Sequence, residues 1–146
     1  AKVPVLVVPE KYREKELHEF KKILYATNFD EKDFIAIEKL VEILKPFDIK
    51  VFCIHVAKDE VSEWDKARLE GMKELLKSKY EKKDFDCRLL QGDDLPGTLD
   101  KFIKDENIDV ISLTTHRRSM ISRLFNPGVA RKMVFHSETP LLIFHA

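Results

Sequence analysis

Hydrophobic positions along the chain fall into six short runs separated by longer, more polar stretches. Most of the runs are continuous and rich in β-branched and aromatic residues, which is typical of strands buried on both faces of a parallel sheet. The run at residues 85–90 instead alternates apolar with charged positions, which predicts an outer strand that is half exposed. The six predicted strands are residues 4–8, 23–27, 51–56, 85–90, 110–114 and 140–145.

Helical patterns lie between the runs from residue 23 onward. Capping residues and prolines mark the ends of three predicted helices: Asp30 or Asp33 with Pro46, then Ser62, then Pro96 in a first turn. A fourth pattern covers residues 119–136, and Pro127 and Gly128 interrupt it. Strands that alternate with helices in this way predict right-handed βαβ units and a parallel three-layer α/β sandwich.

The two ends of the chain resemble each other. Residues 1–10 (AKVPVLVVPE) and 137–146 (SETPLLIFHA) both place a proline, Pro4 or Pro140, before an apolar quartet. Ten residues do not separate a true repeat from two unrelated apolar strands, so both interpretations stay open. The last run is wholly apolar and closes the series, and a bare apolar edge strand promotes aggregation. We therefore expect another subunit or residues 4–8 to cover it.

Composition narrows the class of protein. The chain has 146 residues, 36% of them charged and 44% hydrophobic, with a formal net charge of zero. One domain with a real core is expected at this length. Zero net charge argues against nucleic acid and anionic membranes as partners. No apolar run is long enough to span a bilayer and no signal peptide is visible, so Cys53 and Cys87 are predicted to be reduced thiols in a cytoplasmic protein.

Four segments together resemble a universal stress protein domain: residues 22–30 (KILYATNFD), 51–56 (VFCIHV), 114–130 (TTHRRSMISRLFNPGVA) and 139–144 (TPLLIF). The opening VPVLVVP resembles the C-terminal strand of the same family. The resemblance therefore implies three parts, a strand left from a preceding repeat (residues 1–10), a charged linker (11–21) and the domain itself (22–146). The chain looks like the second half of a tandem protein.

The resemblance also implies a Rossmann-like sheet of the adenine nucleotide alpha hydrolase type, with five parallel strands in the order 3-2-1-4-5. Dimers of the family join antiparallel through the fifth strands, which implies a homodimer or a pseudo-dimer with a preceding repeat. We expect residues 4–8 to lie antiparallel to the last strand, within this chain or swapped between chains. The expected edge residues are Val5, Leu6, Val7, Leu141, Leu142, Ile143 and Phe144.

Ligands of such a sheet bind outside the carboxyl ends of strands one and four. ATP-binding members carry Gly-x2-Gly-x9-Gly-Ser/Thr after strand four, where glycines let backbone N–H groups approach phosphate. All four positions differ here, and Asn28 replaces the family's usual Asp, so no ATP cofactor is predicted. The candidate residues of this degenerate pocket are Thr27, Asn28, Thr114, Thr115, His116, Arg117, Arg118, Pro127 and Gly128.

Three functions remain open. The first is a non-catalytic stress-response protein that acts through dimerisation or partner binding, without ATP. The second is a sensor of a nucleotide or small anion, because Arg117 and Arg118 at a strand-to-helix turn can bind an anion. Salt bridges to the acidic third helix, or solvation, are the favoured explanation of these two arginines. The third is an enzyme such as a nucleotide hydrolase, for which Asp30 is the only nearby acid. His116 and His136 lack partners at metal spacing, so no metal site is predicted.

Overall fold

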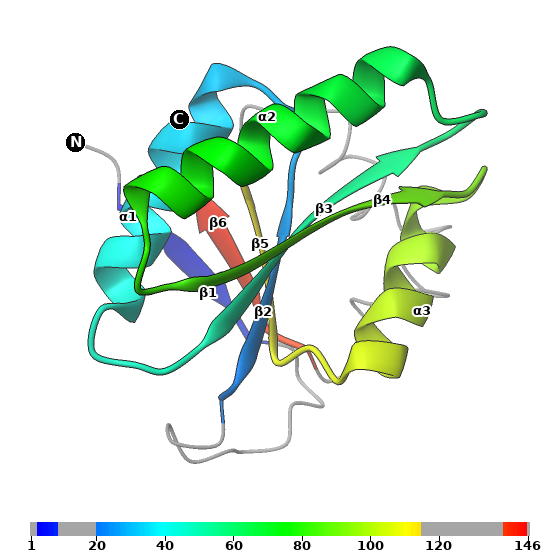
Figure 1. The fold of residues 1–146 in the computed structure, drawn as a ribbon. Helices are drawn as coiled ribbons and strands as arrows, with labels where there is room; N and C mark the ends of the chain where they lie inside the picture. Colours follow the sequence, from blue (N-terminus) through cyan, green and yellow to red (C-terminus); the bar gives the residue numbers. More distant parts are fainter. Residues whose placement is uncertain (1–2, 9–19, 115–138, 146) are drawn as a thin grey trace.

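Six strands form a single sheet in this computed structural model, which describes residues 3–8, 20–114 and 139–145. They are β1 (Val5–Val7), β2 (Lys22–Ala26), β3 (Lys50–Ala57), β4 (Asp84–Gln91), β5 (Val110–Thr114) and β6 (Leu141–Phe144). The spatial order is β1-β6-β5-β2-β3-β4, and β2 lies in the middle (Figure 1). Counted from β2, the parallel strands run 3-2-1-4-5, which confirms the predicted sheet order.

Three helices begin at the residues that the sequence marks. The first, α1 (Glu31–Leu44), has Asp30 as its N-cap and ends before Pro46. The second, α2 (Glu63–Lys79), is capped by Ser62, which exchanges hydrogen bonds with Asp65 in a capping box. The third, α3 (Leu95–Glu106), carries proline in its first turn. The predicted helix at 119–136 and most of the predicted linker at 11–21 lie outside the described residues.

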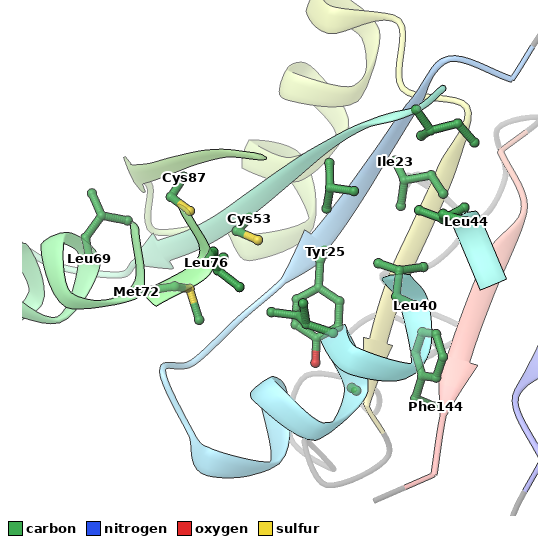
Figure 2. Close-up of a cluster of buried hydrophobic side chains, with 14 residues drawn as sticks. Ile23, Tyr25, Leu40, Leu44, Cys53, Leu69, Met72, Leu76, Cys87 and Phe144 are labelled. Carbon is green, nitrogen blue, oxygen red and sulfur yellow. The ribbon is translucent and has the colours of Figure 1, made fainter. Parts of the chain in front are cut away.

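The helices cover both faces of the sheet. α1 and α2 pack on one face and α3 packs on the other, as Figure 1 shows. Each face of the sheet forms a hydrophobic core with its helices. Figure 2 shows the core under α1 and α2, in which Tyr25 and Phe144 are fully buried near Leu40 of α1. The predicted three-layer sandwich is therefore confirmed. No helix in the described part of the chain is long and apolar enough to cross a membrane.

The two outermost strands differ in kind. β4 is the outer strand next to β3, as its alternating pattern predicts, and Cys87 is its one buried residue. β1 lies antiparallel to β6 at the opposite edge, with Val5 opposite Ile143 and Val7 opposite Leu141. The expected antiparallel cover of the last strand is thus confirmed within this chain.

Candidate functional site

The carboxyl ends of β2 and β5 lie side by side in the middle of the sheet. Tyr25 of β2 is paired with Ser112 of β5, so Thr27 and Thr114 occupy matching positions two residues further along. From β2 the chain continues through α1 to β3 on one side, whereas β5 lies on the other side. This is a topological switch point, the place where open α/β sheets bind ligands.

A buried carboxylate organises the turn that follows β2. Asp33 is 1% exposed and accepts four hydrogen bonds through its two oxygens. The Tyr25 hydroxyl donates to Oδ1 at 2.8 Å, and the Thr27 hydroxyl donates to Oδ2 at 2.9 Å. The backbone N–H groups of Asn28 and Asp30 also donate to Oδ2, at 3.0 and 3.1 Å. The carboxylate therefore ties the end of β2 to the first turn of α1.

An aromatic pair stands beside this turn. Phe29 adopts a positive φ of 61°, a conformation that bulky residues rarely adopt, and its N–H donates to the Thr27 hydroxyl at 3.0 Å. The centroid of its ring lies 4.7 Å from the centroid of the His55 ring. Nδ1 of His55 is 2.8 Å from the Thr27 carbonyl oxygen. A carbonyl can only accept, so Nδ1 carries the proton in this contact and orients the imidazole.

The end of β5 holds a polar group without a partner. Thr114 is fully buried, and its hydroxyl has no hydrogen-bond partner within the part of the chain that the structure describes. By contrast, the Ser112 hydroxyl on the same strand donates to the carbonyl of Leu24 at 3.0 Å. Burial of an unsatisfied hydroxyl is unfavourable by about 1–3 kcal/mol. Among the residues that the structure describes, Thr114 therefore stands out as an unsatisfied polar group at the switch point.

The structure describes only some of the residues predicted to form the pocket. Thr27 and Thr114 lie at the two strand ends as expected, but the Thr27 hydroxyl is engaged by Asp33 and turned away from a ligand. The side chain of Asn28 is exposed at the same edge. The remaining candidates lie outside the described residues: Thr115, His116, Arg117, Arg118, Pro127 and Gly128. Among the described residues no group of three His, Cys, Asp or Glu side chains could hold a metal ion.

Sequence reasoning assigned Asp33 only a capping role and left Phe29 and His55 out of the site. The capping box between Asp30 and Asp33 does carry a local signal, because its three-residue spacing is typical of a helix start. That signal says nothing about Tyr25 and Thr27, which reach the same carboxylate from the strand. The aromatic pair leaves no local signal, since its two rings come from different strand ends.

A sequence profile of the universal stress protein family matches residues 19–145. The chain belongs to the universal stress protein family. Its order of strands and helices and the switch point between β2 and β5 agree with this membership. No curated protein sequence matches the chain.

Solved structures of universal stress proteins share the fold. One from Archaeoglobus fulgidus DSM 4304 superposes with a TM-score of 0.68 at 17% identity, over 99% of this chain and 50% of that one. This chain thus spans half the length of that relative. A universal stress protein in complex with cAMP gives 0.61 at 16% identity, over 86% and 96% of the two chains. A second Archaeoglobus fulgidus protein gives 0.60 at 14%, over 85% and 93%.

Proposed function

We propose that this universal stress protein is non-catalytic and acts by pairing with a second domain of its own kind through the edge formed by β6 and β1. One observation carries the proposal. Val5, Leu6 and Val7 are 45%, 56% and 38% exposed, although all three are paired with β6. Successive residues of a strand point to opposite faces. Both faces of β1 are therefore apolar and open to solvent, as they would be in a strand that belongs to a neighbouring sheet.

We further propose that β1 is the last strand of a preceding repeat. Two observations support a tandem arrangement. The relative from Archaeoglobus fulgidus DSM 4304 matches this chain over 99% of its length, but the match takes up only 50% of that relative. The antiparallel register of β1 and β6 is also the one that a two-fold axis between equivalent last strands would produce. The rest of the preceding domain would then cover the exposed side chains of β1.

Sedimentation velocity over a range of protein concentrations tests the pairing. The 146-residue chain is expected to self-associate, and Leu6→Lys on β1 is expected to shift it to monomer. Leu75→Lys on α2 is the matched control, because Leu75 is 47% exposed and α2 packs over β4 at the opposite edge of the sheet. A chain that stays monomeric at every concentration would refute the proposal. So would equal dissociation by the two substitutions, since charge alone would then explain the result.

A second candidate function, binding of a nucleotide or small anion at the switch point, is favoured by the Thr114 hydroxyl. Phe29 and His55 supply two aromatic rings, inclined at 45° to each other, at the same edge of the sheet. The universal stress protein solved with cAMP shows that one protein of this fold holds a nucleotide. We propose no obligatory ATP cofactor, because the glycines of the family's phosphate loop are replaced in this sequence.

Thermal unfolding with cAMP, AMP, ADP, Mg-ATP, phosphate and sulfate tests this second function. A ligand at 100 times its Kd adds about 2.7 kcal/mol to the free energy of unfolding, which is on the order of 5–10 °C in Tm for a domain of this size. Thr114→Val is expected to abolish the ligand shift without lowering the Tm of the free protein. Ser112→Ala, which removes a satisfied hydroxyl, should lower the Tm but keep the shift. No shift with any of these compounds would refute binding.

We also propose the cytoplasm as the working compartment. Cys53 and Cys87 are both free and buried in the structure. Free thiols persist where glutathione and thioredoxin keep the surroundings reducing, which supports this assignment.

A further inference from the structure

The two cysteines of the chain face each other across the outer pair of strands. Cys53 of β3 is the register partner of Cys87 of β4. Both side chains point to the face of the sheet that α2 covers, where Met72 and Leu76 pack over them (Figure 2). The sequence contains no other cysteine. The fold therefore brings every thiol of the chain together in one place.

The spacing of the strands fits a covalent bond between the two sulfur atoms. Neighbouring strands lie about 4.7–4.9 Å apart, and the Cα atoms of disulfide-bonded cysteines are usually about 4.4–6.8 Å apart. β4 is paired on one side only, with β3, so its backbone can adjust without breaking a second set of strand pairings. A disulfide can thus form between these residues with little movement of the sheet.

The two thiols differ in how deeply they are buried, since Cys87 is 5% exposed and Cys53 is 0% exposed. Cys87 lines a pocket of about 260 Å³ at the junction of α2 and β4, whereas Cys53 is fully buried behind it. The other residues around the pocket are Lys73, Lys77, Tyr80, Glu81, Lys83 and Phe85. Three of these carry positive charge and Glu81 carries negative charge. The lining is therefore positive on balance, which favours a thiolate on the sulfur at its wall.

The pKa values of the two thiols differ in direction because their surroundings differ. The hydrogen bond from the Cys53 thiol lowers the pKa of Cys87, and burial opposes it. The charge of Lys73 also lowers this pKa, whereas the charges of Asp86 and Glu70 raise it. The same hydrogen bond and complete burial raise the pKa of Cys53 well above its usual range. The pair therefore consists of a more acidic thiol at the pocket wall and a fully buried, less acidic thiol beside it.

We propose that Cys87 and Cys53 form a redox-active pair, in which Cys87 reacts with a hydroperoxide in the pocket and Cys53 then closes a reversible disulfide. In the first step the Cys87 thiolate attacks a peroxide oxygen and the O–O bond breaks. Sulfur is oxidised to the sulfenic acid, and the departing oxygen takes a proton from solvent to leave as water or an alcohol. In the second step the Cys53 sulfur displaces the hydroxyl group of the sulfenic acid. That group leaves as water with the Cys53 proton.

This site is separate from the switch point and from the β1 edge. An external dithiol or glutathione would restore the pair by thiol–disulfide exchange, becoming oxidised itself. Disulfides that do form in reducing compartments are mostly transient, and they are catalytic or redox-sensing. Oxidation is expected to link β3 covalently to β4, on the face of the sheet that α2 covers.

The decisive experiment uses the whole chain. The reduced protein is treated with stoichiometric hydrogen peroxide, remaining thiols are blocked with N-ethylmaleimide, and the mass is measured without reduction. The expected product is a single chain that carries no maleimide and has lost two hydrogen atoms. The urea-unfolded chain is the control, because it lacks the pairing and should react more slowly and without preference between the two thiols.

Single variants assign the two roles. With dimedone as the trap, Cys53→Ala should be labelled at Cys87, and Cys87→Ala should be labelled at Cys53 at least roughly tenfold more slowly. Circular dichroism of each variant shows whether it is folded. The proposal fails if the oxidised wild-type chain still accepts two maleimides, or if the disulfide forms only between chains. It also fails if the two folded variants are labelled at equal rates. The wild-type mass is decisive even if both variants unfold.

Discussion

The two edges of the sheet are built from opposite kinds of residue. At the β4 edge, Arg88 pairs with Asp86 at 2.9 Å and with Glu106 of α3 at 3.5 Å. Its guanidinium also lies over the ring of Phe52, 5.4 Å from the centroid. At the β1 edge, three apolar residues are paired with β6 and remain exposed. One edge of the sheet thus carries paired charged side chains, and the other exposes hydrophobic side chains.

Under the proposed pairing, this difference decides which edge of the sheet meets a partner. Charged side chains on an outer strand discourage the addition of a further strand. An exposed apolar strand does the reverse, and in a stable protein it marks a surface that a partner covers. Substitutions at one edge at a time therefore test both the proposed pairing and the fold.

The largest effect is expected in β6, the strand that pairs with β1. Phe144→Ala should lower the free energy of unfolding by about 3–5 kcal/mol, because Phe144 is fully buried against α1. Val7→Ala on the exposed strand should cost less than about 1 kcal/mol in the monomeric chain. Urea unfolding measures both values. Equal losses would show that β1 is part of this domain's core and would remove the contrast between the edges.

The turn that ends β4 should give the next largest effect. A Cβ atom at Gly92 would clash with Oγ1 of Thr98 on α3 and would lie 3.1 Å from its Cβ. Gly92→Ala should therefore destabilise the protein by about 1–3 kcal/mol through overpacking. Gly71→Ala is the matched control, because nothing lies within 4 Å of a Cβ there. In the middle of α2 it should stabilise by about 0.4–1 kcal/mol. Calorimetry of both variants measures these changes in stability. If Gly92→Ala left the stability unchanged, the packing of the turn after β4 against α3 would be loose.

Removing the arginine of the charged edge should have a moderate effect. Arg88→Ala is expected to lower the free energy of unfolding by about 1 kcal/mol, since it removes partly exposed ion pairs and a stacking contact. Lys101→Ala removes a short ion pair to Asp105, but both partners are largely exposed, and the change should be smaller. Denaturant titration at low and high salt distinguishes them. If salt abolished the whole effect of Arg88→Ala, stacking on the rings would play no part.

The smallest effect is a dependence on pH. The hydrogen bond from Arg88 lowers the pKa of Asp86 below its usual value. A carboxyl with a lowered pKa in the folded state stabilises the protein above about pH 4 and loses this contribution as the pH falls through the folded pKa. Asp86→Asn should therefore flatten the acid limb of the stability curve by a few tenths of a kcal/mol. Arg88→Ala should flatten the same limb, and an unchanged limb in both variants would contradict the assignment.

Most of the fold could be predicted because its signals are local. The apolar runs, the N-caps Asp30 and Ser62 and the alternation at residues 85–90 each act within a few residues of chain. The order of the strands and the antiparallel extra strand came from the family resemblance. Both agree with the structure.

The chemistry of the interior could not be predicted in the same way. Four donors meet at Asp33 only after β2 and α1 pack together, and no spacing in the sequence announces the Tyr25 hydroxyl among them. The pairing of Cys53 with Cys87 depends on the register of two strands separated by all of α2. A shift of one residue would send one thiol to the opposite face. Such juxtapositions are properties of the register, which hydrophobic periodicity leaves open.

The carboxylate of Asp33 also decides what kind of ligand the β2 end of the sheet will accept. The first turn of a helix carries unpaired N–H groups and a partial positive charge, which attract phosphate in many α/β proteins. At α1 this role is already filled by the protein's own carboxylates. Asp30 accepts from the N–H of Lys32 in the first turn, and Asp33 accepts from four donors at the end of β2. The helix end behaves as though its anion-binding place were permanently taken. A negatively charged ligand must therefore find its counter-charge elsewhere, and the β2 end is left to recognise shape and ring faces.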